Sequence, residues 1–185
     1  MPSRADHGMA ASAFDALLEL ERLGREHGAD LPAREEPGED WVGVGFRLGG
    51  QRFVAPMAEV AELLKYPDLA PIPRTKSWVR GMANVRGTLL PVMDLNGYLG
   101  EHVSSLTRLS RVLVMPIENA YTGVLVDEVF GMRHFPKENV GAAPEGVEAR
   151  YAPYVTGQVE DQGERWLVFS MRALAEDPQF LMVAS

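Results

Sequence analysis

The side chains that most often carry enzyme chemistry are sparse in this sequence. No cysteine is present to act as a nucleophile or a thiolate ligand. The histidines never fall at the spacing of a metal-binding motif; they are His7, His27, His102 and His134. Asp127 and Glu128 are adjacent, and neighbours on a strand point to opposite faces, so they make a poor pair for acid–base catalysis. We therefore expect no catalytic residue and no metal site.

Phosphate-binding and hydrolase motifs are also missing. The glycines at 43, 45 and 49 are too widely spaced for a dinucleotide-binding fingerprint, and their segment reads as a hairpin rather than as a strand that leads into a helix. The sequence has neither a Walker A motif nor a GxSxG nucleophile motif. No cofactor is expected. A hydrolase that uses the Asp94 or Asp127 region is a further alternative.

Composition and charge narrow the range of partners. The 185 residues are 46% hydrophobic and carry a net charge of -8, which argues against a general nucleic-acid binder. No apolar run is long enough to span a bilayer, so we expect a cytoplasmic protein with no direct membrane insertion. Residues 65–86 are locally basic, and a partner with an acidic surface could recognise them, although a solvated loop face explains them equally well.

The strongly acidic part of the chain is residues 1–40, which hold ten acidic and four basic residues. Apolar residues at near-helical spacing predict a short amphipathic helix over residues 12–27. Residues 28–40 contain two prolines and almost nothing to bury, which is typical of a linker. We therefore divide the chain into an N-terminal acidic extension at 1–40 and a folded domain at 41–185.

The folded domain reads as short strands separated by turns. Alternating hydrophobicity and turn residues predict four hairpins, formed by residues 41–48 with 51–55, 81–85 with 88–93, 111–117 with 121–127, and 154–159 with 165–170. Asp94 is a plausible cap for a brief helical turn, and residues 171–176 are expected to form a closing helix. Residues 56–66 fit either a short helix or a turn and a strand. The pattern favours a mainly β barrel or sandwich.

An internal repeat indicates one small β unit used twice. Residues 78–81 recur as 154–157, and at the same offset of 76 Asp94 falls on Ser170. Further upstream, residues 59–60 match residues 128–129 at an offset of 69. Each copy is too short for a large core, so the two should pack together, with a cleft between them where a partner or ligand could bind.

An ordered series of motifs then gives a specific resemblance. After the Gly-Gly hairpin come VAEL at 60–63, PIP at 71–73, GMANVRG at 81–87 and PVMDL at 91–95. This series resembles the CheW-type coupling proteins, whose pattern includes G-x-x-N-[LV]-R-G and P-[VI]-x-D-L. GVLVDEVFGM at 123–132 is similar to a further motif of that family. The resemblance covers the chain from about Trp41 and is greatest to the branch that serves type IV pili and twitching motility.

The resemblance implies a fold of two small five-stranded SH3-like barrels packed together, with residues 56–66 only briefly helical before a strand. It implies a non-catalytic adaptor that joins the cytoplasmic tip of a methyl-accepting chemoreceptor to the regulatory domain of a CheA-type histidine kinase. By position in the motifs, Glu62 and Arg86 match the charged interaction residues of the family, and Val60 and Val85 flank them as apolar contacts. The alternatives are a flagellar CheW protein and a small-molecule-binding β domain.

Overall fold

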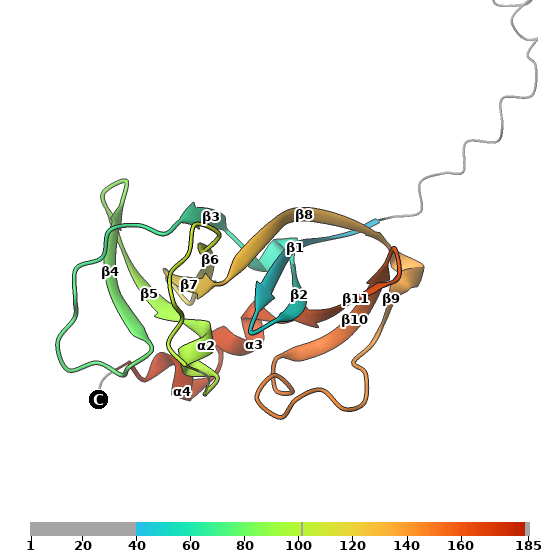
Figure 1. Ribbon diagram of the computed structural model, residues 1–185. Coiled ribbons are helices and arrows are strands. Elements are labelled where there is room, and N and C mark those ends of the chain that lie inside the picture. Colours follow the sequence, from blue (N-terminus) through green and yellow to red (C-terminus); the bar gives the residue numbers. More distant parts are fainter. Residues whose placement is uncertain (1–39, 101, 184–185) are drawn as a thin grey trace, which may run out of the picture. The chain divides into compact units, whose positions relative to one another are not determined.

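The computed structural model describes residues 40–100 and 102–183 (Figure 1). Its strands are β1 Asp40–Leu48, β2 Gln51–Pro56, β3 Glu62–Lys65, β4 Val79–Val85, β5 Thr88–Asp94, β6 Arg111–Ile117, β7 Ala120–Val126, β8 Glu128–Pro136, β9 Val140–Ala142, β10 Val155–Asp161 and β11 Glu164–Phe169. Its helices are short: the 3-10 turns η1 Met57–Glu59 and η2 Lys137–Asn139, and the helices α2 Leu95–Tyr98, α3 Met171–Ala175 and α4 Pro178–Leu181. The helix expected over residues 12–27 lies outside the described residues.

The strands form two curled sheets, and the prediction of a mainly β fold is confirmed. One sheet has five strands in the order β3-β6-β7-β5-β4. The other has six, in the order β8-β1-β2-β11-β10-β9, because the three-residue strand β9 adds an edge that the sequence did not predict. The hairpin β1–β2 belongs to the six-stranded sheet although it comes first in the chain, so that sheet is built from two separated stretches of sequence, whereas the five-stranded sheet uses the consecutive strands β3 to β7.

The internal repeat is visible in the strand register. Gly45 pairs with Gly131 between β1 and β8, and the residues 69 positions away, Val114 and Glu62, pair between β6 and β3. β4 and β10 each carry an irregularity at the corresponding place, between Val79 and Gly81 and between residues 155 and 157. The two sheets therefore repeat one strand arrangement, which confirms the repeat that the sequence predicted.

The helical turns that follow the two repeats begin in the same way. Asp94 and Ser170 have nearly equal backbone angles, φ -87 and ψ 110 against φ -85 and ψ 108, and each side chain accepts a hydrogen bond from a backbone N–H of the following turn. Such N-terminal caps satisfy donors that the first helical turn leaves free. The cap expected at Asp94 is therefore confirmed.

The largest core lies between the two sheets. Phe46, Phe53 and Phe169 of the six-stranded sheet have fully buried rings with centroids 5.5–5.9 Å apart. They join Leu113 and Val124 of the five-stranded sheet in one buried cluster. Because burial of an aromatic side chain contributes several kcal/mol at most sites, this shared cluster holds the two sheets as one folded unit.

Two segments differ from the hairpin reading of the sequence. One is β8, which the sequence did not predict as a strand. It starts at Glu128, and Asp127 alone separates it from the end of β7. Residues 56–66 form the one-turn η1 and then β3, as the family resemblance implied, so of the two readings left open above the turn and strand is the correct one. Pro178 begins α4 one residue after the cap Asp177, an arrangement that favours helix initiation.

Candidate functional site

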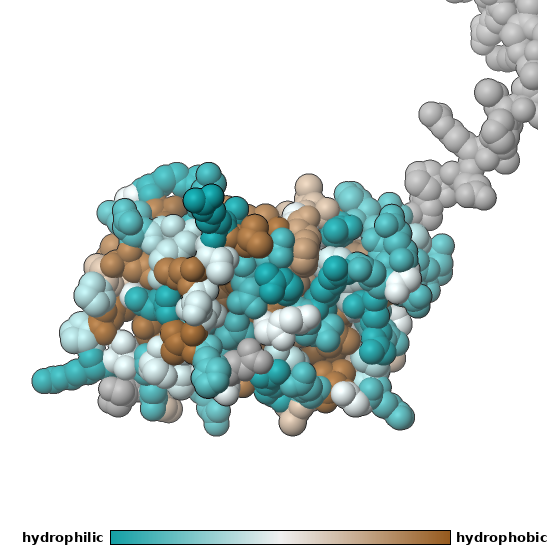
Figure 2. Space-filling view, viewed as in Figure 1, coloured by the Kyte–Doolittle hydropathy of each residue, from teal (hydrophilic) through white to brown (hydrophobic). Residues whose placement is uncertain are grey.

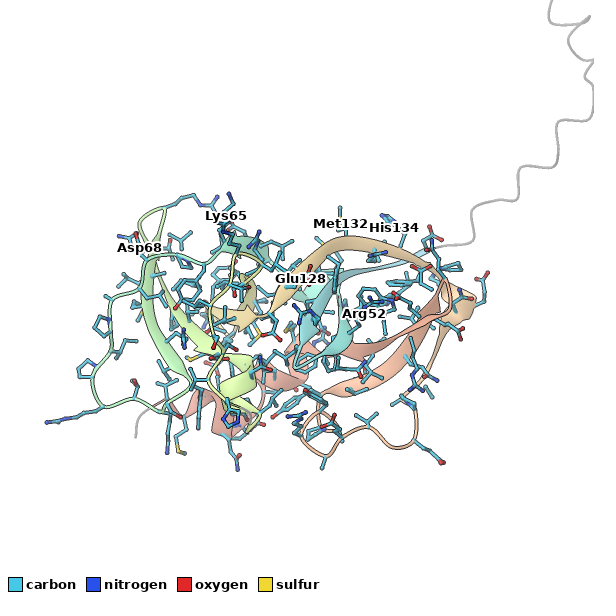
Figure 3. The ribbon with its side chains drawn as sticks, viewed as in Figure 1. Arg52, Lys65, Asp68, Glu128, Met132 and His134 are labelled. Atoms are coloured by element: carbon cyan, nitrogen blue, oxygen red, sulfur yellow. The ribbon has the colours of Figure 1, made fainter. Side chains whose placement is uncertain are left out.

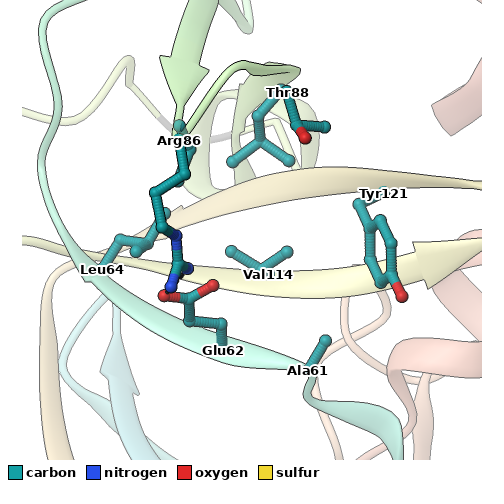
Figure 4. Close-up of a pocket in the computed structure, with 9 residues that line it drawn as sticks. Ala61, Glu62, Leu64, Arg86, Thr88, Val114 and Tyr121 are labelled. Atoms are coloured by element: carbon teal, nitrogen blue, oxygen red, sulfur yellow. Dashed lines mark hydrogen bonds and ion pairs between the residues drawn. The ribbon is translucent and has the colours of Figure 1, made fainter.

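A groove opens at the mouth of the five-stranded sheet, between β3 and the β4–β5 hairpin (Figure 4). It has a volume of about 290 Å³. Its walls come from the five strands of this sheet, the residue before β3 and the β4–β5 turn, and the residues that line it are Ala61, Glu62, Leu64, Val85, Arg86, Thr88, Leu90, Val114 and Tyr121.

The β4–β5 turn places Arg86 on the rim of this groove. Arg86 and Gly87 both have positive φ, 51° and 82°, the conformation of the tight turns that match the twist of a hairpin. The side chain of Asn84 accepts a hydrogen bond from the Gly87 N–H at 2.9 Å, which fixes the turn. Arg86 therefore stands at a hairpin tip with its side chain 71% exposed.

The charge of Arg86 is paired within the chain. Its guanidinium donates a hydrogen bond to the carboxylate of Glu62 on β3 and forms an ion pair with it (Figure 4). The side chain of Glu62 is 38% exposed, and ion pairs this exposed contribute about 0–1 kcal/mol to stability. The pair therefore does little for folding, and it presents both charges to solvent on one rim.

The floor of the groove is apolar. Leu90 and Val114 are buried and belong to the small core of the five-stranded sheet, and Leu64 and Val85 pack against that core. Tyr121 forms part of the wall, 51% exposed. On the face shown in Figure 2, hydrophobic surface is more extensive over the half that contains β4 and β5 than over the other half. An apolar floor with a charged rim is the usual arrangement of a protein-binding surface.

Three of the four residues predicted from the sequence meet in this groove, namely Glu62, Val85 and Arg86. The fourth does not: Val60 is 7% exposed and lies in the core between the sheets, so it does not provide the exposed apolar area that was expected. Val60 is buried because η1 turns the chain inward just before β3 begins. Tyr121 was missed, although an aromatic residue directly after a predicted hairpin turn is a usable signal.

Asp94 and Asp127, the residues of the hydrolase alternative, have structural roles. The Asp94 side chain is fully buried and accepts hydrogen bonds from the Gly97 N–H, the Ser104 N–H and the Ser104 hydroxyl. Asp127 accepts from the Gly49 N–H and from the Asn96 side-chain amide, each at 2.9 Å. Both carboxylates therefore accept hydrogen bonds that stabilise the fold.

A second hollow of about 470 Å³ lies where η1 and the end of β6 meet α3 and α4. Glu59 lies on its rim and accepts a hydrogen bond from the Arg172 N–H at 3.1 Å, which helps to cap α3. Within residues 40–100 and 102–183 no three potential metal ligands come together. No helix in the same part of the chain is long and apolar enough to cross a membrane.

Comparison with known proteins gives consistent matches. Residues 42–179 match the CheW-like domain family. The chain is 46% identical to Protein PilI of Pseudomonas aeruginosa over 92% of its own length and 96% of that protein, and 32% identical to Protein FrzA of Myxococcus xanthus over 73% and 82%. The crystal structure of the scaffolding protein TtCheW from Thermoanaerobacter tengcongensis has a similar fold, with a TM-score of 0.63 at 22% identity over 70% of this chain and 88% of that one.

Proposed function

The chain belongs to the CheW-like domain family, and on that premise we propose that it is a non-catalytic adaptor that couples a methyl-accepting chemoreceptor to a CheA-type histidine kinase. In this proposal it works in the cytoplasm, beside membrane-bound receptor arrays, and reaches them only through protein contacts. We further propose that residues 1–40 form an N-terminal extension and residues 41–185 the CheW-like domain, with Asp40 already part of β1 at the boundary.

The observation that carries the proposal is the groove with its paired rim charges. The apolar floor, which includes Leu90 and Val114, offers area that a partner can bury, and Arg86 and Glu62 offer charges that a partner can recognise. An interface of this kind gains specificity from its charges and remains exchangeable when it is small. We propose Glu62, Val85 and Arg86 as partner-binding residues, whereas Val60 supports the fold behind them.

The assignment to type IV pilus control rests on the similarity to PilI, which covers nearly the whole chain. The relatives named CheW match shorter parts at lower identity, for example 25% over 77% of this chain for the Treponema pallidum protein. We therefore propose twitching motility rather than flagellar chemotaxis as the process that the adaptor serves.

Binding measurements on the full chain test the proposal. Calorimetric titrations with a receptor-tip fragment and with the kinase regulatory domain should each show binding without any cofactor. The variant Arg86→Glu should weaken at least one of these affinities by about 30-fold or more, the effect of losing a desolvated charge pair. Arg74→Glu is the matched control, because Arg74 is also an exposed arginine at positive φ but lies outside the groove. If the parent chain binds neither fragment, the adaptor function is refuted.

A small-molecule-binding domain is the second candidate, favoured by the existence of the hollows. A volume of about 290 Å³ is at the lower end of the range for small-molecule pockets, and the groove is open to solvent along one side. A thermal-stability screen with metabolites separates the two functions, because a ligand that binds the folded state raises the melting temperature by mass action. The adaptor proposal expects no such shift from metabolites at micromolar concentrations.

A further inference from the structure

The internal repeat gives every position of the groove a counterpart in the six-stranded sheet. At an offset of 69, Ala61, Leu64 and Val114 correspond to Phe130, Arg133 and Gly45; Tyr121 corresponds to Arg52. At an offset of 76, Arg86, Thr88 and Leu90 correspond to Gln162, Glu164 and Trp166. The match extends to backbone geometry, because Gln162 has the same φ of 51° as Arg86. The two mouths can therefore be compared residue by residue.

In the six-stranded sheet, the position that corresponds to the groove, here called its mouth, is filled by an aromatic ring. Trp166 is 2% exposed, and Phe130 packs against it edge to face with ring centroids 5.3 Å apart. Gly45 lies directly beneath the indole, where an added Cβ would be 3.0 Å from the ring. The absence of a side chain at Gly45 therefore makes the space that the ring occupies.

Two arginines cover this ring. The guanidinium carbons of Arg52 and Arg133 lie 5.5 and 5.2 Å from the Trp166 ring centroid, within the range of cation–π attraction. Arg52 pairs with Glu164, and Arg133 lies 3.8 Å from a carboxylate oxygen of Asp161. Figure 3 shows Arg52 inside the curl of this sheet, whereas Met132 and His134 of β8 project outward. This position therefore holds an aromatic ring beneath two arginines, each of which has an acidic neighbour.

In the groove, smaller residues stand where these rings would be. Leu90 takes the place of Trp166, and exposed Ala61 takes the place of Phe130. The volume of about 290 Å³ is what the five-stranded sheet leaves open at the position that the chain fills with its own indole in the other sheet. Arg86 stands on the rim, where it can stack on a ring inserted below it.

We propose that this groove receives the side chain of a tryptophan or phenylalanine from a partner protein and holds it between the apolar floor and the guanidinium of Arg86. The inference deepens the proposed function and rests on it, because it names the chemistry by which the partner is recognised. Within residues 40–100 and 102–183 every tryptophan and phenylalanine is buried or partly buried, so a second copy of this domain offers no fully exposed ring from that region. Aromatic anchors are also the side chains most enriched at the centres of protein interfaces.

Nuclear magnetic resonance titration of the full chain with N-acetyl-tryptophanamide tests the proposal. Backbone amide shifts should change at the groove, above all at Leu64, Val85 and Leu90, with a dissociation constant on the order of 1 mM, as expected for a ligand of this size. N-acetyl-leucinamide should bind several-fold more weakly. Equal binding of the two amides, or shift changes confined to other parts of the chain, would overturn the aromatic assignment.

Substitutions that fill the groove give the matched controls. Ala61→Phe places a ring where the other sheet has Phe130, and it should weaken binding of the tryptophan amide by at least tenfold. Because Ala61 is exposed, the variant should fold; Ala152→Phe, at an exposed alanine outside the groove, should bind like the parent. Should Ala61→Phe bind the tryptophan amide as tightly as the parent, the proposed site is wrong.

Two further outcomes separate the possible occupants and functions. If Phe14→Ala changes the backbone amide chemical shifts of the groove residues in the free chain, the ring comes from the chain's own extension and the partner assignment is overturned. If the tryptophan amide does not bind while receptor and kinase fragments still bind in an Arg86-dependent way, the aromatic inference alone fails. If the amide binds but neither fragment does, the adaptor function fails and the aromatic site stands.

Discussion

Replacement of Asp94 should cost far more stability than replacement of its counterpart Ser170. Both side chains cap a helical turn at the same point of the repeat. Asp94 also holds the loop that follows α2, since it accepts the Ser104 N–H at 2.6 Å and the Ser104 hydroxyl at 2.8 Å, and Arg80 lies 3.7 Å away. Ser170 caps Ala173 and makes only a long contact of 3.4 Å with Glu59.

The structure sets the size of the difference. A buried donor left without a partner costs about 1–3 kcal/mol, and Asp94→Ala removes the acceptor of three partly buried donors and the carboxylate near the Arg80 guanidinium. Some of these groups can reach water, so the free energy of unfolding should fall by about 3–5 kcal/mol. Ser170→Ala removes one cap and should cost about 1 kcal/mol. Asp94→Ser, which keeps a capping oxygen but is too short to hold Ser104, should lie between them at about 2 kcal/mol.

Urea denaturation of the full chain, followed by circular dichroism, measures these differences from the transition midpoints. If Asp94→Ala does not fold, the loss of unfolding free energy in Asp94→Ser is compared with that of Ser170→Ala instead. The reasoning is refuted if Asp94→Ala and Ser170→Ala lose the same stability within about 1 kcal/mol, because the carboxylate would then be no more than a helix cap.

Further predictions concern the packing between and within the sheets. The hydroxyl of Tyr154 donates a hydrogen bond to Asp177 and lowers the pKa of that carboxyl below 3.8. The ionised form therefore stabilises the fold above that pH, so Asp177→Asn should cost about 1–2 kcal/mol at pH 7 and progressively less below about pH 3.8, measured by urea denaturation across pH. Gly81→Ala should cost at least about 2 kcal/mol, since φ is 142° and the new Cβ would be 2.5 Å from a backbone oxygen, whereas Gly87→Ala, which meets no atom within 4 Å, should cost about 1 kcal/mol. Trp166→Ala should lower the free energy of unfolding by about 3–5 kcal/mol, and equal melting of variant and parent would contradict a packed ring.

Local patterns predicted much of the fold, because hairpins and caps depend on few residues. The Gly49–Gly50 and Arg86–Gly87 turns carry the positive φ that their sequences favour, and alternating hydrophobicity located the flanking strands. The repeat was visible because the two copies need the same side chains at the same bends. β8 escaped prediction since it is a half-exposed edge strand and carries little of the alternation that marks a buried face.

The candidate site depends on contacts that no local pattern contains. Glu62 and Arg86 are 24 positions apart, and they meet only because the five-stranded sheet curls until β3 faces the β4–β5 turn. The family motifs selected both residues without indicating that they pair with each other. Val60 was selected with them because it is apolar and adjacent in sequence, but the turn at η1 directs it into the core.

Binding of the kinase regulatory domain to a charge-swapped adaptor tests the central claim most directly. Titrations would compare the parent with Arg86→Glu, Glu62→Arg and the double variant that exchanges the two charges. If a partner recognises the rim, the double variant should restore the internal ion pair yet still bind at least about tenfold more weakly than the parent, because each charge then faces the wrong group of the partner. Parental affinity in the double variant, or in both single variants, would contradict the claim that this groove is the docking surface.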